Sequence, residues 1–168
     1  GIMEKSSLEQ LEKNIFLSGS LGLTEFFEPY LDIWVRGENI YFEAIQEELI
    51  GTVDIDVSIK GKDDVTVYGT IPIIDVELFK EFTSTNLSSS FSKENRVSYN
   101  YKINFPITGK FTLLNNQIDA SLVGDVSIIK NNNSTADFSG EVIFKKGKLY
   151  YSGDIFTIME GHLMFDKI

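Results

Sequence analysis

The chain has 168 residues, of which 42% are hydrophobic, and its formal net charge at neutral pH is −10. This length accommodates one domain with a sizeable core. Binding to a phosphate backbone depends on clustered lysine and arginine, so the acidic balance argues against a nucleic-acid partner. The absence of cysteine excludes disulfides and thiolate metal sites.

Neither end of the sequence carries a recognisable boundary. No run of about 18 apolar residues occurs, so the sequence contains no helical membrane span. The N-terminal Gly1–Lys5 has no apolar signal core, and Leu163–Ile168 stops inside an alternating pattern. We therefore expect the chain to be a segment of a longer protein that carries its targeting and anchoring sequences elsewhere.

Helical periodicity is confined to the N-terminus. Met3–Asn14 predicts a short helix, because Ser6 or Ser7 can cap it and Leu8 and Leu11 recur at helical spacing. Beyond this segment the period of the apolar residues is mostly two.

Alternation of apolar and polar residues predicts strands along most of the remaining chain. The clearest case is Val53–Lys60, where every odd position is β-branched and apolar and every even position is polar. The same pattern predicts strands at 31–35, 40–44, 65–67, 70–75, 99–105, 110–114, 117–122, 125–129, 141–144, 148–151, 155–159 and 162–165. Turn-forming residues separate them at 37–39, 61–64, 115–116, 131–134, 145–147 and 152–154. Short strands at this spacing predict a meander of antiparallel hairpins.

Two halves of the chain resemble each other, at about 15–82 and 99–168. In each half a strand leads into a glycine, an alternating strand follows, and a second glycine precedes another apolar strand. A Ser-rich loop at 83–98 separates the halves, and Thr24–Tyr30 and Val76–Phe82 suit a short helix as well as a strand. The repeat favours an extended stack within a single β domain over a closed globule.

No constellation typical of catalysis occurs in the sequence. His162, the single histidine, lies in a predicted strand, where a solvent-facing or structural role is the ordinary expectation. Asp54 and Asp56 share one strand face and could hold a cation or act as an acid/base pair, but a solvated face is the simpler interpretation. Trp34 is either a partner contact or a partly exposed strand residue. The sequence therefore predicts no enzyme, no catalytic residue, no cofactor and no metal site.

The apolar positions of the alternating strands form one long face. A sheet with a single apolar face must bury it against a second layer, against itself by curling, or against a ligand. No substantial amphipathic helix is predicted to cover it, so two interpretations stay open: a sandwich with a dry core, and a curled trough that accepts acyl chains. The residues predicted to line such a trough are Ile33, Val35, Ile40, Phe42, Val53, Ile55, Val57, Ile59, Ile71, Ile73, Ile103, Phe105, Phe111, Leu113, Leu122, Val126, Ile128, Val142, Phe144, Leu149, Tyr151, Phe156, Ile158, Leu163 and Phe165.

Glycine and apolar residues recur at similar spacing in several stretches: Leu31–Gly37 and Gly51–Ile55, and again Asp119–Val126, Phe138–Leu149 and Phe156–Phe165. This spacing resembles that of the C-terminal domain family of TamB, the translocation and assembly module subunit, over most of 31–165. The resemblance implies a β-taco fold, which is an elongated, curled, U-shaped antiparallel sheet with an apolar interior.

The resemblance further implies a long protein of the AsmA-like and bridge-type lipid transfer group, anchored in the inner membrane of a diderm bacterium and crossing the periplasm. Such proteins are associated with phospholipid movement to the outer membrane, and with a TamA/BamA-type barrel partner in the assembly of outer-membrane proteins. We expect this segment to bind phospholipid acyl chains in its groove. The alternative is a structural sandwich that presents an edge strand, at Leu163–Phe165, to a barrel-assembly partner.

Overall fold

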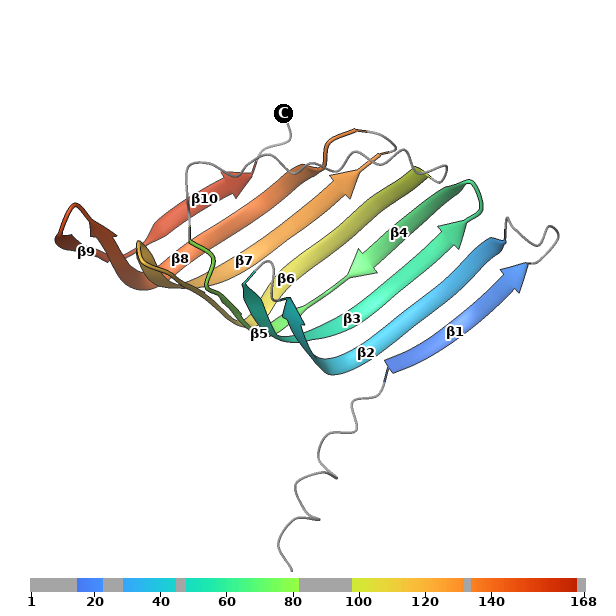
Figure 1. Cartoon of the computed structure of the whole chain (residues 1–168), viewed down its shortest axis with the longest axis horizontal. Helices are drawn as coiled ribbons and strands as arrows, with labels where there is room; N and C mark the ends of the chain where they lie inside the picture. The colour runs from blue at the N-terminus through green and yellow to red at the C-terminus, as the bar shows by residue number, and fades with distance from the viewer. Residues whose placement is uncertain (1–14, 23–28, 45–47, 82–97, 132–133, 166–168) are drawn as a thin grey trace, which may run out of the picture.

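The computed structural model describes residues 15–22, 29–44, 48–81, 98–131 and 134–165, and all the strands in these ranges belong to one sheet (Figure 1). The described ranges contain no helix, so the predicted all-β, curled fold is confirmed. The helix predicted at 3–14 lies outside the described residues. The strands are β1 (Ile15–Gly22), β2 (Tyr30–Ala44), β3 (Leu49–Gly61), β4 (Asp64–Thr70), β5 (Ile73–Leu78), β6 (Ser98–Leu114), β7 (Ile118–Lys130), β8 (Asp137–Tyr151), β9 (Asp154–Ile158) and β10 (Gly161–Phe165).

The strands follow the order β1-β2-β3-β4-β6-β7-β8-β10, with β5 between β3 and β6 and with β9 beside β8. Neighbours pair antiparallel except at one seam, where β4 and β5 both run parallel to β6. The predicted meander of antiparallel hairpins is therefore wrong at this seam. β5 ends at Leu78, and β6 begins at Ser98, which pairs with Asp64 at the start of β4, so β6 runs in the same direction as β4. Parallel neighbours need such a long return, whereas tight turns join antiparallel strands.

β4 and β5 follow one another along the same line of the sheet and are interrupted at Ile71–Pro72. Proline has no backbone N–H to donate, so it disfavours an uninterrupted central strand here. The sequence predicted one strand over 70–75, and the structure divides it at this point. It also assigns 76–78, which suited helix and strand equally, to strand β5. The interruption stays hydrogen-bonded, because the Ile71 amide donates to Asn104 O and the Pro72 carbonyl accepts from the Asp54 amide.

The register places apolar side chains from every strand on one face of the sheet, which we call the inner face. Directly paired residues point to the same side of a sheet. Ile33 pairs with Ile59 in β2 and β3, and Ile103 pairs with Ile128 in β6 and β7. Every hydrophobic residue that is buried in the described ranges lies on this face: Ile40, Val53, Val57, Val65, Val76, Leu113, Ala120, Leu122 and Val142.

Irregularities in neighbouring strands line up in one row across the sheet, which we call the crease. The crease comprises residues 38–39 of β2, 74 of β5, 108–110 of β6 and 145 of β8, each inserted opposite a partner strand with fewer residues. A bulge bends its strand and increases its twist. Because the bulges coincide, the whole sheet folds along the crease into two walls, and Figure 1 shows the strands turning near the lower edge of the view.

The crease explains two predicted turns that the structure does not contain. Gly37–Asn39 and Lys145–Gly147 lie inside the continuous strands β2 and β8. Asn39 has a φ of 52°, and its backbone amide donates to the Asp54 carboxylate at 2.8 Å. Asn39 therefore suits a bulge as well as a turn, because both select residues that tolerate positive φ. The turns predicted at 61–64, 115–116, 131–134 and 152–154 do fall between consecutive strands.

Candidate functional site

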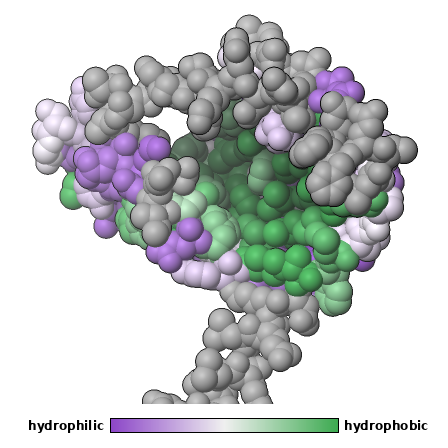
Figure 2. Space-filling view, turned by 45° about the vertical axis from the view of Figure 1, so that its right-hand side comes forward, coloured by the Kyte–Doolittle hydropathy of each residue, from purple (hydrophilic) through white to green (hydrophobic). Residues whose placement is uncertain are grey.

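The two walls of the folded sheet enclose a trough lined by the inner face. β1, β4 and β10 belong to one wall and β5 and β9 to the other, while β2, β3, β6, β7 and β8 cross the crease and contribute to both. Figure 2 shows hydrophobic residues gathered in the hollow of the molecule. The crease therefore turns one apolar sheet face into a concave apolar surface.

The residues predicted to line a trough, with the exception of Ile71, share the inner face. All of them except Ile71 occupy paired strand positions, and most of these pairs join two apolar residues or an apolar residue and a glycine, as in Leu122 with Phe144 and Phe42 with Gly51. Ile71 lies in the short connection between β4 and β5. The sequence pattern thus identified residues that the fold brings together, and their binding to lipid stays a prediction.

The inner face is most buried in the central strands and most exposed at the two ends of the trough. Val76, close to the crease, is 2% exposed, and Leu113 and Leu122 belong to one buried cluster. At opposite ends, Leu17 of β1 is 71% exposed and Tyr151 of β8 is 72% exposed. All the described strands belong to one sheet, so in this part of the chain no second sheet covers the inner face. The described residues form a folded-over single sheet rather than a two-sheet sandwich.

Polar side chains interrupt the inner face at one edge, and the sequence interpretation did not single them out. Tyr99 and Tyr101 of β6 have the same parity as Ile103, and Lys130 ends β7 opposite Tyr101. The predicted strand stopped at Ile129 and the predicted turn began at Asn131, so Lys130 was assigned to neither. The signal that could have identified it is the continued alternation from Ile128.

Charged side chains on the opposite, outer face pair with one another. The Trp34 indole N–H donates to Asp56 Oδ1 at 2.6 Å, and Arg36 pairs with Asp56 Oδ2 at 3.3 Å while lying over the Trp34 ring. The Trp34 hydrogen bond, followed by Arg36, holds the pKa of Asp56 below its usual value. Asp54 accepts from the Asn39 amide. Each carboxylate of the predicted pair is thus held by protein donors on the outside of the sheet, and Trp34 is part of the same network.

His162 also lies on the outer face, between two carboxylates. Its Nδ1 is 2.7 Å from Glu141 Oε1, and its Nε2 is 3.8 Å from Glu160 Oε1. The hydrogen bond to Glu141 raises the pKa of the imidazole. The ring is half exposed and ties β10 to β8. In the described ranges no group of three or more histidine, aspartate or glutamate side chains is placed to hold a metal ion.

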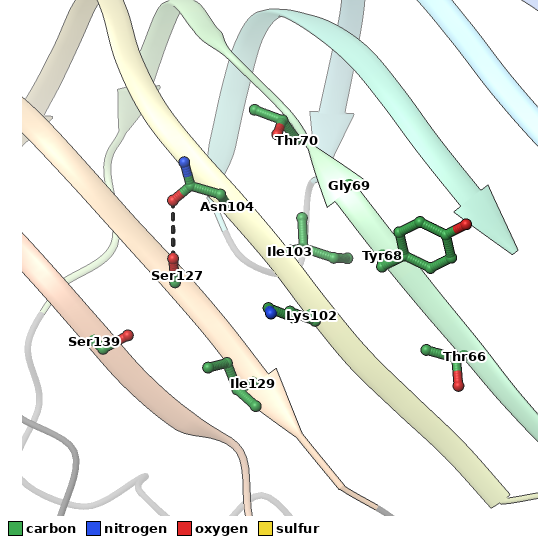
Figure 3. Close-up of a pocket in the computed structure, with 10 residues that line it drawn as sticks. All are labelled: Thr66, Tyr68, Gly69, Thr70, Lys102, Ile103, Asn104, Ser127, Ile129 and Ser139. Carbon is green, nitrogen blue, oxygen red and sulfur yellow. Dashed lines mark hydrogen bonds between the residues drawn. The ribbon is translucent and has the colours of Figure 1, made fainter.

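A shallow depression of about 460 Å³ lies on the outer face over β4, β6, β7 and β8 (Figure 3). Its lining includes Tyr68, Lys102 and Asn104, together with several serine and threonine hydroxyls. Ser127 Oγ donates to Asn104 Oδ1 at 2.9 Å, which is the bond drawn in Figure 3. This lining pairs no nucleophile with a base, so the depression supports no catalytic assignment.

Comparison with known proteins adds no assignment. No protein-family model matches the chain, and no curated protein matches it. No helix within the described ranges is long and apolar enough to cross a membrane. A functional interpretation therefore rests on the trough and on the resemblance in sequence spacing.

Proposed function

We propose that this chain is a segment of a TamB-like envelope protein and that its trough holds the acyl chains of phospholipids. The observation that carries the proposal is the continuous apolar inner face, which is only partly buried and is exposed at both ends. Acyl chains bind through area removed from water, at about 25 cal/mol per Å². Such binding needs a wide and uniform surface rather than individual polar contacts.

The proposed setting is the periplasm of a diderm bacterium, in a longer protein anchored in the inner membrane and conducting phospholipid toward the outer membrane. A uniform trough lets a tail slide, because successive positions have similar energies. The acidic balance of the chain, with a net charge of −10, keeps the segment soluble and away from anionic membrane surfaces. The proposal involves no catalytic step and no cofactor.

Single-cysteine labelling tests the trough, because the chain has no native cysteine to react. The inner-face positions to substitute, one at a time, are Phe42, Val57, Phe105, Val126 and Phe144. Ser58 and Ser127 are matched controls, since each follows an inner-face position directly and points to the outer face. Phospholipid is expected to block labelling on the inner face and to leave both controls unchanged. Inner-face cysteines that react equally with and without lipid, or that never react, would contradict the proposal.

A second candidate function is supported by the free edges of the sheet. Among the described strands β1 pairs only with β2. It contains no charged residue and leaves Phe16 66% exposed and Leu17 71% exposed. At the other end, β10 leaves Met164 66% exposed. Exposed edge strands are templates for another strand. We propose that they offer pairing to a TamA/BamA-type barrel protein, and photo-crosslinks from such a partner confined to the trough would count against this role.

A further inference from the structure

The inner face carries very little charge, and this makes its exceptions informative. Among the paired strand positions of the described residues, only Lys130 and Asp154 place a charged side chain on the inner face. Asp154 sits beside the turn that joins β8 to β9. Lys130 is therefore the single cation among these inner-face positions, in a chain whose net charge is −10.

Lys130 sits where the apolar surface meets an edge of the sheet. It pairs with Tyr101, and its ammonium nitrogen lies 5.8 Å from the centroid of the Tyr101 ring, within the range of a cation–π contact. Tyr99 occupies the next inner-face position toward the same edge and is 40% exposed. Within the described residues no carboxylate pairs with the Lys130 ammonium. Its positive charge is thus not neutralised by any described carboxylate.

This placement suits the polar end of an amphiphile. The row next to Tyr101 and Lys130 on the inner face consists of Ile103 and Ile128, and Phe105 and Val126 form the row after that. A tail along these rows would bring its terminal group to the ammonium and the phenol hydroxyls. The Lys130 ammonium and the two tyrosine hydroxyls are hydrogen-bond donors, and their hydrogen bonds are stronger when the acceptor is anionic.

We propose that Lys130, with Tyr101 and Tyr99, binds the anionic group of an amphiphile whose tail lies in the trough. This inference rests on the proposed acyl-binding function and adds a preference for a negatively charged end. Fatty-acid carboxylates and phosphate-ended lipids share this chemistry, an apolar tail ending in anionic oxygens. The rest of the acidic chain repels such ligands, so this cation sets both the preference and the orientation of the tail.

The test compares four amphiphiles with the same tetradecyl tail, below their micelle concentrations and at pH 8: tetradecanoate, a monoacyl glycerophosphate, a neutral monoacylglycerol and a trimethylammonium. Binding of each is measured on the full chain by displacement of a fluorescent fatty acid. Lys130→Gln is expected to weaken both anionic ligands about three- to tenfold and to leave the neutral ligand unchanged. Lys130→Arg is expected to retain the preference.

Lys102→Gln is the matched control, because Lys102 pairs with Ile129, the neighbour of Lys130, and points to the outer face. Equal weakening by both glutamine variants would assign the effect to overall charge and overturn the inference. Equal binding of neutral and anionic ligands by the wild-type chain would overturn it while leaving the trough intact. Failure of all four ligands to bind would remove the proposed function itself. A preference for one anionic ligand over the other would identify carboxylate or phosphate as the recognised group.

Discussion

Replacing Gly51 with alanine probes how closely β3 and β5 approach on the inner face. A Cβ at Gly51 would lie 2.3 Å from Asp75 O, 2.6 Å from Val76 Cα and 2.7 Å from a Val76 methyl carbon, whereas ordinary contacts begin near 3.4 Å. The two nearest atoms are backbone, so the strands must part by about 1 Å. Overpacking of this kind costs about 1–3 kcal/mol. Loss of unfolded-chain entropy offsets only about 0.4–1 kcal/mol of that cost.

We therefore expect Gly51→Ala to lower the free energy of unfolding by about 1–2 kcal/mol. Urea unfolding followed by the fluorescence of Trp34, the single tryptophan, measures this change. Gly161→Ala is the control, because a Cβ there would meet Phe144 at 3.5 Å, an ordinary contact distance. The control is expected to be neutral or slightly stabilising. Equal stability of the two variants would refute the close approach of β3 and β5.

Three further predictions address the core, pH and the length of the bound tail. Leu113→Ala, at a side chain 6% exposed, is expected to lower unfolding free energy by about 2–5 kcal/mol in urea titrations. Leu114→Ala, at the adjacent side chain that is 40% exposed, is expected to change it by less than about 0.5 kcal/mol; similar losses in both would contradict the assignment of faces. The hydrogen bond to Glu141 raises the pKa of His162, so the protonated imidazole stabilises the folded state. This stabilisation is fully present below pH 6.5, the usual histidine pKa, and is lost as the pH rises through the raised pKa of the folded state. In His162→Gln, the urea midpoint should no longer fall over this pH range. A pH profile unchanged from that of the wild-type chain would exclude the His162–Glu141 pair as the source of the pH dependence. Two added methylenes on a neutral amphiphile are expected to tighten binding by up to about 15-fold, at ~0.8 kcal/mol each; binding independent of tail length would exclude burial of the tail.

Alternation along the sequence predicted the inner face well, because alternate residues of a regularly paired strand point to the same face of the sheet. Ile33 and Val35 have odd numbers, Ile40 and Phe42 have even numbers, and all of them lie on the same face. Residues 38 and 39 together oppose the single residue Asp54, and this one extra residue produces the change of parity. Reading each short stretch separately therefore gave the right face on both sides of an undetected bulge.

Features that depend on contacts between distant residues could not be predicted in the same way. Gly37–Asn39 looks the same whether the chain reverses or only bends, and the outcome depends on the Asp54 carboxylate of the neighbouring strand. The parallel seam depends on where β6 begins relative to β4, which no local pattern encodes. The position of Lys130 beside Tyr101 likewise follows only from the register of β6 and β7.

The parallel seam has a consequence for how the chain folds. On either side of it, in the described residues, β1–β5 and β6–β10 pair only with strands close in sequence. Contacts of this kind form early, because little chain entropy is lost in closing short loops. Joining β4 and β5 to β6 closes the longest loop and is therefore the natural slow step. Removal of residues 82–97 severs no pairing of the described strands within either set, so fragments 1–81 and 98–168 are the units from which the sheet should reassemble.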